Sequence, residues 1–329
     1  MLRRTFAAAT VAVLATLPAA QTAQAEDYPV NRLTLVVPFN PGGSADRMAR
    51  AVASFLPSEL GDIPVTVVNR PGGSGTLGHT WFLQQPDDGS FALITPANPY
   101  LISNVLRSDG RLNWDDFHFI NGQWQDYYVL FVNNEQPFQT ADELMDFIVE
   151  NPGEASAAVI AGDGGHLSTL ILLEQLGLPS DAVNFITYDG GGPMRTAIAG
   201  NQVTFSITAA LGTDVIADHV RPLAVFQDEP RPEWDAPLIN DILAERGLEV
   251  PTIAADLRTL TVHRSFYENH PDRYEMLVEA YRRTLEREDF QRFIAASAIA
   301  GDWRGPEVTQ SSLNESFEIF SRYIHVLED

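Results

Sequence analysis

The stretch that decides the fold is residues 33–46, which read LTLVVPFNPGGSAD. Residues 33–37 form a compact, mostly apolar run that predicts a buried strand, and Pro38 ends it. Gly42 and Gly43 make the turn that follows, and a helical pattern then runs from 44 to 60. The stretch is therefore predicted to be one strand–loop–helix unit.

The same unit recurs downstream of this stretch. We predict a strand at 65–68, a helix at 74–85 and, after an Asp-Gly turn at 88–89, a strand at 91–95. This alternation of strands and helices is typical of a parallel sheet with helices on both faces.

A second series of strands and helices begins near residue 127. We predict strands at 127–132, 155–160, 184–187, 203–207, 223–226 and 257–262, and helices at 141–150, 167–176, 194–199, 272–287 and 311–326. The strands at 127–132 and 223–226 are interpreted as crossovers between two domains. The predicted division is residues 26–126 with 227–329 as one domain and 127–226 as the other. Two α/β domains joined by two strands form a cleft, which is where small ligands bind.

The first 25 residues have the pattern of a cleaved secretory signal peptide. Arg3 and Arg4 precede an apolar run at 6–17, and Ala23-Gln24-Ala25 is a small-residue cleavage site. The run is shorter than the ~20 residues that span a bilayer, so a membrane anchor fits less well. The paired arginines leave general or twin-arginine export open. We expect a mature chain that starts near Glu26 and is located in the periplasm.

The composition excludes several classes of protein. The chain contains no cysteine, which rules out disulfides, thiolate catalysis, Cys-ligated zinc and a lipid-modified N-terminal Cys. Its 44 acidic and 21 basic residues give a net charge of −23, which disfavours nucleic acid and anionic membranes as partners. We expect a monomer of two domains, because about 300 residues exceed the usual size of one core.

The first candidate ligand-binding loop joins the strand at 33–37 to its helix. Glycines allow a ligand close to the backbone, and the N–H groups of a first helical turn favour an anion without any basic side chain. Asp46 lies in that turn and is interpreted either as a cap or as a group that holds waters or a ligand N–H. The candidate residues of this loop are Phe39, Asn40, Gly42, Gly43, Ser44 and Asp46.

A second loop of the same kind follows the strand at 155–160, in the other predicted domain. Its candidate residues are Asp163, Gly164, Gly165 and His166, although an ordinary glycine-rich turn is the alternative and His166 fits a cap better than a ligand contact. Two such loops facing each other would offer N–H groups from both sides of the cleft. Four further candidates are Tyr188 and Asp189 in a third glycine-rich turn, and Thr95 and Asn98 at the end of a strand.

Motifs for catalysis and cofactors are mostly absent from the sequence. There is no G-x-S-x-G, no H-E-x-x-H, and, without lysine, no P-loop. Gly73–Gly78 matches G-x-G-x-x-G, but the next strand does not end in the acidic residue that a dinucleotide site requires. We therefore expect no cofactor, no metal and no enzymatic activity.

Several of these segments resemble the Bug family of extracytoplasmic binding proteins, the receptors of tripartite tricarboxylate transporters. The resemblance extends over nearly the whole mature chain. It rests on Tyr28-Pro29, on Val37-Pro38-Phe39-x-Pro41-Gly42-Gly43-x-x-Asp46, on Val68-Asn69-Arg70-Pro71-Gly72 with Gly75 and Gly78, and more weakly on Pro86–Gly89, Asn151-Pro152-Gly153, Tyr188-x-Gly190, Gly200-x-x-Val203 and Arg221–Val225.

The resemblance implies the type II periplasmic-binding fold, in which each domain is a mixed sheet flanked by helices and the cleft lies between the domains. It also implies a ligand carboxylate held between residues 39–46 and 162–166, with Asp46 in a water-bridged network. The implied function is capture of a small organic carboxylate for membrane transporter subunits. Presentation of the ligand to a membrane histidine kinase is the alternative, and an exported enzyme is a weaker one.

The chain departs from the family pattern beside the expected cleft. Acidic Asp189 stands where the family commonly has lysine, and Asp163 and His166 occupy a loop that usually contains serine or threonine. The W-x-G-L region of the family is also altered, around Asp256–Leu260. The added acids place citrate in doubt and favour a ligand that also carries an amine or hydroxyl groups, such as an amino acid or hydroxy acid.

Overall fold

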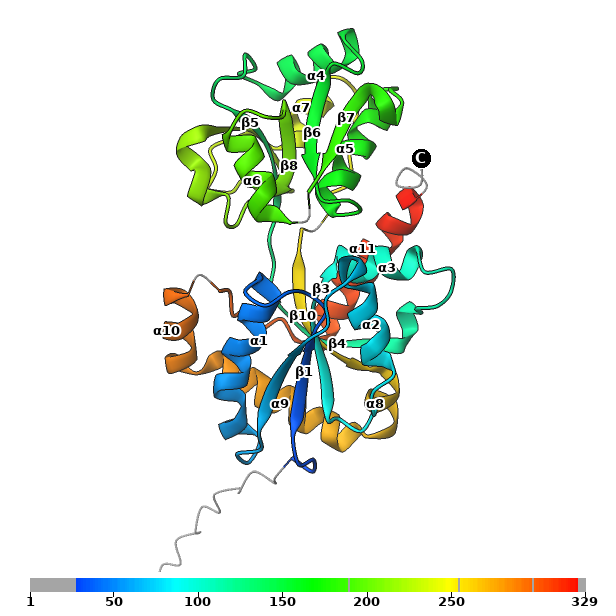
Figure 1. Ribbon diagram of the computed structural model, residues 1–329, viewed down its shortest axis with the longest axis vertical. Coiled ribbons are helices and arrows are strands. Elements are labelled where there is room, and N and C mark those ends of the chain that lie inside the picture. The colour runs from blue at the N-terminus through cyan, green and yellow to red at the C-terminus, as the bar shows by residue number, and fades with distance from the viewer. Residues whose placement is uncertain (1–27, 189, 254, 298, 325–329) are drawn as a thin grey trace, which may run out of the picture.

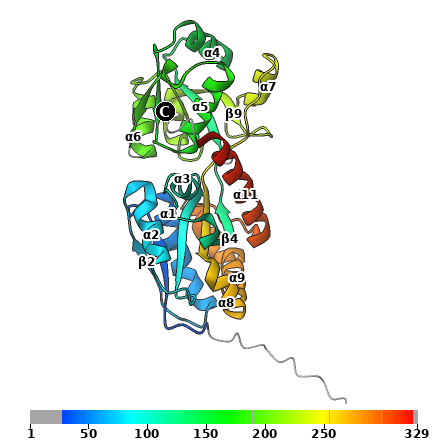
Figure 2. The ribbon, with the colours of Figure 1, turned by 90° about the vertical axis from the view of Figure 1, so that its right-hand side faces the viewer.

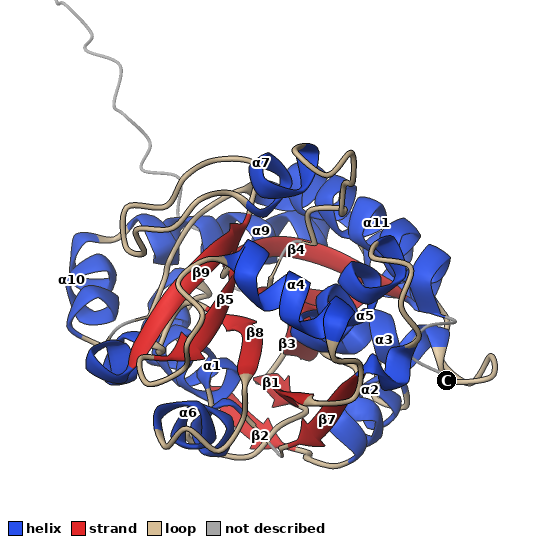
Figure 3. Ribbon diagram, turned by 90° about the horizontal axis from the view of Figure 1, so that it is seen from above, coloured by secondary structure: helices blue, strands red, loops and turns tan. Residues whose placement is uncertain are grey.

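The computed structural model describes residues 28–324 except 189, 254 and 298. The predicted signal peptide and Asp189 therefore lie outside the described residues. The chain forms two bodies, each built on its own five-stranded sheet (Figure 1). Helices surround both sheets (Figure 3). The prediction of an α/β fold with two mixed sheets is confirmed.

The first sheet has the order β2-β1-β3-β10-β4. β1 pairs in parallel with β2 and β3, whereas β10 runs antiparallel to β3 and β4. Its strands are β1 (Leu33–Val37), β2 (Val65–Asn69), β3 (Phe91–Asn98), β4 (Phe117–Trp124) and β10 (Leu257–His263). Every residue of β1 is buried, as expected for a central strand covered on both faces.

Helices and short 3-10 turns cover the first sheet. They are α1 (Ser44–Phe55), η1 (Leu56–Glu59), η2 (Gly73–Gly75), α2 (Thr76–Leu83), α3 (Tyr100–Leu106), η3 (Trp114–Asp116), α8 (Arg264–Asn269), α9 (Pro271–Glu286), α10 (Glu288–Ala296) and α11 (Gly305–Tyr323). α1 buries Ala45, Met48, Ala49 and Val52, whose spacing places them on one face of the helix. α11 packs on β4 and α3 and extends toward the second body (Figure 2).

The second sheet has the order β7-β6-β8-β5-β9. Its strands are β5 (Tyr128–Asn133), β6 (Ala155–Val159), β7 (Val183–Thr187), β8 (Phe205–Ala209) and β9 (Val220–Phe226). β6 is parallel to β7 and β8, and β5 is antiparallel to β8 and β9. The accompanying helices are α4 (Ala141–Glu150), α5 (Gly164–Gln175), η4 (Ser180–Ala182), α6 (Gly191–Ala199), η5 (Asp214–His219) and α7 (Ile239–Ala244). Thr140 caps α4, as predicted, by accepting from Glu143 N–H at 3.2 Å.

The chain leaves the first sheet after Trp124 and enters the second at Tyr128. The return lies later than predicted, because residues 227–250, which were predicted to belong to the first domain, lie against the second sheet. Leu238 bridges to Val225 of β9, α7 packs on the same strand, and Arg246 forms ion pairs with α4. The segment just before α7 thereby pairs with part of the edge strand β9.

Several elements of the first body differ from the prediction. β3 continues through Pro96 to Asn98 and is followed at once by α3, which was not predicted. The strand β4 and the helices α8 and α10 were not predicted either. β4 was hidden because all eight of its residues are buried, polar ones included, so the strand shows no alternation of apolar and polar residues.

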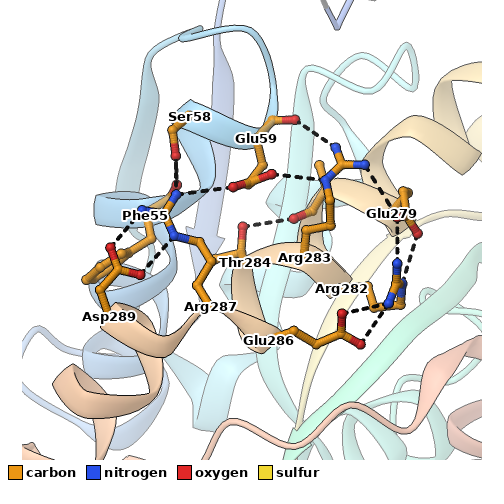
Figure 4. Close-up of polar contacts among 11 residues, drawn as sticks. Phe55, Ser58, Glu59, Glu279, Arg282, Arg283, Thr284, Glu286, Arg287 and Asp289 are labelled. Carbon is orange, nitrogen blue, oxygen red and sulfur yellow. Dashed lines mark hydrogen bonds and ion pairs between the residues drawn. The ribbon is translucent and has the colours of Figure 1, made fainter. Parts of the chain in front are cut away.

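A network of ion pairs joins α9 and α10 to η1 on the first body (Figure 4). Glu59 accepts from Arg283 at 3.0 Å and from Arg287 at 3.1 Å. Arg287 also pairs with Asp289 at 2.7 Å. These links tie the C-terminal helices to a segment more than 200 residues earlier in the chain.

Among the described residues, every helix is too short or too polar to span a bilayer.

Candidate functional site

The loop after β1 is held in shape by the Asp46 carboxylate. Gly43 is the N-cap of α1 but provides no side-chain cap, and Gly42 turns the chain with a φ of +88°. One Asp46 oxygen accepts from Gly42 N–H at 2.8 Å and from Arg50 Nε at 2.9 Å. The other accepts from Asn69 Nδ2 at 2.9 Å. Asp46 therefore braces its own loop from the third position of the helix.

The same contacts keep Asp46 charged. Burial raises the pKa of Asp46, but the hydrogen bonds from Arg50, Gly42 and Asn69 together hold it below its ordinary value. Asn69 Nδ2 also donates to the Phe39 carbonyl at 3.0 Å, so β2 fixes both ends of the loop. Gly42 and Gly43 remain exposed at the start of α1, where helix N–H groups lack intrahelical partners.

The loop after β6 is organised in a similar way around Asp163. Asp163 is the N-cap of α5 and accepts from His166 N–H at 2.8 Å. His166 Nδ1 accepts in turn from Gly162 N–H at 3.2 Å. Burial, aided by Arg107, lowers the pKa of His166 to about 4, so the ring is neutral at pH 7. His166 is thus a structural part of the cap.

Glycines in this loop allow close packing. A Cβ on Gly165 would lie 2.0 Å from the Ile207 carbonyl oxygen of β8. A Cβ on Gly164 would lie 2.5 Å from the Tyr128 hydroxyl, which is buried and has no partner in the described structure. A side chain at Gly165 would require the backbone of β8 to move, and one at Gly164 would require the Tyr128 ring to move.

Both loops lie where the two bodies meet, on either side of α3. Phe39 packs edge-on against Tyr100 with ring centroids 5.3 Å apart. One turn later, Ser103 Oγ donates to the Gly162 carbonyl at 3.0 Å. α3 lies at the end of the first body that faces the second (Figures 1 and 2). The structure therefore brings the two predicted loops to one interface.

A buried arginine missed in the sequence joins the first loop to β10. Arg258 is 6% exposed, and its Nε donates to Ser44 Oγ at 2.7 Å. Its Nη2 pairs with Asp256 at 3.0 Å, and the guanidinium lies over Trp124 at 4.5 Å. This contact joins residues that are 214 positions apart, so no local pattern in the sequence predicts it.

Three carboxyl groups near this interface are shifted toward their neutral forms. Burial raises the pKa of Asp163 to about 8 and that of Asp126 to about 6. It also raises the pKa of Asp256, although Arg258 and Arg195 oppose the shift. At pH 7 Asp163 is therefore mostly protonated, whereas Asp126 stays mostly ionised and Asp256 is paired with Arg258.

The other predicted site residues differ in how accessible they are. Thr95 and Asn98 are fully buried within β3, which ends at Asn98, and Thr95 Oγ1 lies 2.9 Å from His79 Nε2. Asn40 is exposed on the first loop. Tyr188 is half-buried and packs on the core of the second body.

Close packing and backbone conformation explain the glycines in the segment Gly73–Gly78. A Cβ on Gly78 would approach Pro38 and the Arg70 carbonyl to within 2.6 Å. Gly73 and Gly75 have φ values of +56° and +98° in the turn before α2. Within the described residues, no group of His, Cys, Asp or Glu side chains could hold a metal ion.

A cavity of about 930 Å³, here called the side pocket, opens beside the two loops. It lies between the turn after β2, the helices α2 and α3, and residues 161–162 of the second body. Two residues of its wall, Asn69 and Tyr100, contact Phe39 of the first loop. A third, Gly162, belongs to the second loop. Three arginines that line it, Arg70, Arg107 and Arg111, were not among the predicted site residues.

Comparison with known proteins points to a single family. A profile of the tripartite tricarboxylate transporter family receptor matches residues 48–250. Protein BugT of Bordetella pertussis is 29% identical over 221 residues, which cover 66% of this chain and 67% of that protein. A Cupriavidus necator protein encoded in the gbd 5′ region is 32% identical over 61% of this chain and 60% of its own length.

Solved structures show the same fold. A protein of R. palustris with adipate has a TM-score of 0.70 at 24% identity, over 92% of this chain and 99% of that chain. MatC from Rhodopseudomonas palustris with bound malate has a TM-score of 0.69 at 21% identity, over 91% and 99%.

Proposed function

Because the chain belongs to the tripartite tricarboxylate transporter receptor family, we propose that it captures a small organic carboxylate in the periplasm. Members of this family are substrate-binding receptors, and the chain is accordingly a binding protein and not an enzyme. The predicted leader at residues 1–25 and the solved relatives described as periplasmic support the location.

The observation that carries this proposal is the pair of braced loops at the domain interface. Each loop follows a parallel strand and begins a helix of 12 residues, α1 or α5. A helix N-terminus favours negative charge, and its free N–H groups suit a carboxylate. Adipate and malate, bound by two structural relatives, belong to this ligand class.

Arg258 adds a fixed positive charge behind the first loop. Its guanidinium is buried and bound to Ser44 at the start of α1. The Asp256 partner offsets part of that charge. Burial also favours the neutral form of Asp163, which lowers the negative charge beside the second loop and makes an anion easier to accept there.

Binding is proposed to close the two bodies on each other, and the closed form to be recognised by membrane transporter subunits. The chain crosses between sheets at 125–127 and again before Leu257. Asp126 N–H donates to the Asp256 carbonyl at 3.3 Å, so the two crossings are hydrogen-bonded. A paired hinge of this kind suits a closing motion.

A thermal-shift screen of the mature protein tests the proposal. The panel contains mono-, di- and tricarboxylates, hydroxy acids, amino acids and aromatic acids. A ligand at about 1,000 times its dissociation constant adds about 4 kcal/mol to stability, which raises Tm by several degrees. Protein that has been denatured and refolded serves as the control for a co-purified ligand. Absence of any shift across the carboxylates in refolded protein would contradict carboxylate capture.

A further inference from the structure

The side pocket has a charge opposite to that of the rest of the protein. The chain carries 44 acidic against 21 basic residues, yet the described residues that line the pocket include three arginines and no aspartate or glutamate. Asp109 lies between Arg107 and Arg111 in the sequence, but it does not line the pocket. The positive charge of the side pocket therefore attracts anions locally, although the protein as a whole repels them.

The three arginines are also free of carboxylate partners. Within the described part of the chain, none of Arg70, Arg107 and Arg111 forms an ion pair, whereas some other arginines, such as Arg246 and Arg282, pair with Asp or Glu. Arg70 donates to the Asn69 carbonyl at 3.2 Å, and Arg111 Nε donates to the Ser108 carbonyl at 2.9 Å. Most of their donors therefore remain available to a ligand.

One of these arginines is held in place by an aromatic ring. The Arg70 guanidinium carbon lies 4.5 Å from the centroid of the Trp81 ring, so a cation–π contact restrains this side chain. Trp81 lines the pocket as well. A planar acid group that docks on Arg70 would change the environment of this indole.

The pocket is connected to the carboxylate loops through shared residues. Asn69 lines it and hydrogen-bonds to Asp46, and Tyr100 lines it and packs on Phe39. From the second body, Gly162 lines it next to Asp163. An occupant would thus contact both bodies beside the proposed site.

We propose that the side pocket is a second anion-binding subsite, in which Arg70, Arg107 and Arg111 hold an acid group of the captured ligand. The inference rests on the proposed function. The first carboxylate lies at the helix N-termini, and a second carboxylate or phosphate group, further along the same molecule, lies among the arginines. The arginines then select ligands with two separated acid groups over monoacids of the same length.

The test compares wild type with the variant R70Q/R107Q/R111Q. Affinities are measured by calorimetry for matched pairs such as adipate with hexanoate, and for citrate. Each exposed charged contact contributes up to about fivefold, so the triple variant should bind the preferred diacid or triacid roughly 100-fold more weakly. Binding of hexanoate, if detectable, should change less than about twofold. Arg292→Gln, on exposed α10 far from the pocket, is the matched control and should leave every affinity unchanged.

A second measurement does not require the physiological ligand. Inorganic pyrophosphate titrated into wild type should change tryptophan fluorescence, and the change should disappear in Trp81→Phe and in the triple variant. Equal diacid affinity in wild type and triple variant, or equal losses for diacid and monoacid, would overturn the inference while carboxylate capture stands. Absence of any pyrophosphate response in wild type would also overturn it. Failure of carboxylate capture is seen separately, as a thermal screen without a carboxylate response.

Discussion

Replacing Asp46 with alanine tests whether the braced loop is needed for binding. The change removes three hydrogen bonds, from Gly42 N–H at 2.8 Å, Arg50 Nε at 2.9 Å and Asn69 Nδ2 at 2.9 Å. The bonds from Gly42 and Asn69 are worth about 1–1.5 kcal/mol each. The pair with Arg50, whose side chain is 55% exposed, adds at most about 0.5 kcal/mol. The expected loss of stability is therefore about 3 kcal/mol.

The loss in affinity follows from the released loop. Without Asp46, residues 40–43 must be ordered again when a ligand binds, at about 1–2 kcal/mol for each residue that becomes fixed. Fixing one or two residues weakens binding roughly 10- to 100-fold. The loss of stability leaves most proteins folded, since their unfolding free energies are about 5–15 kcal/mol.

Two assays on three proteins check this reasoning. Urea unfolding gives stability and calorimetry gives affinity, for wild type, Asp46→Ala and Asp46→Asn. The asparagine keeps one acceptor oxygen and should fall between the other two. Because the pKa of Asp46 is lowered in the folded protein, its stabilisation is present above about pH 4 and is lost as the pH falls through the folded value. The stability gap between wild type and Asp46→Asn should shrink below pH 4. Wild-type affinity in Asp46→Ala would refute a role for the brace in binding.

Three further changes test the packing and charge arguments. Gly165→Ala should lower the free energy of unfolding in urea by more than about 3 kcal/mol, because its Cβ would lie 2.0 Å from the Ile207 carbonyl oxygen. The control is Gly192→Ala in the first turn of α6, whose Cβ meets nothing within 4 Å and which should be neutral or stabilising by up to about 1 kcal/mol. Similar losses in both variants would contradict the packing argument. Asp163 has a pKa raised to about 8, so folding favours its protonated form and stability falls as the pH rises from about 4 to 8. Asp163→Asn keeps the cap of α5 and should lose less stability than wild type between pH 5 and 8. The same pH profile of stability in wild type and variant would refute the shift. Glu59→Gln weakens two ion pairs of a residue whose side chain is 20% exposed. Thermal unfolding should therefore show a loss of about 1 kcal/mol in stability, and this loss should shrink in 1 M salt. A loss of stability that does not depend on salt would point to packing instead.

Local patterns in the sequence predicted most of the strands, the longer helices and the loops between them, but they missed β4 and the helices α3, α7, α8 and α10. The run at 33–37, the glycines that follow it and the helix from Ser44 lie within one continuous segment, so their chemistry can be interpreted without the rest of the chain. The same holds for β6 and α5, and for the Thr140 cap. The resemblance at these loops correctly indicated the family.

Only the tertiary structure decided what those loops contact. Asp46 is braced by Asn69, 23 residues away, and Ser44 is bound by Arg258, 214 residues away. A side chain at Gly165 would clash with the Ile207 carbonyl of β8. Residues 227–250 belong with the second sheet because α7 packs on β9. The side pocket likewise combines arginines from two segments of the first body with Gly162 of the second. Propensity and periodicity act over a few residues, whereas these contacts depend on how distant elements pack, and no pattern within one segment encodes them.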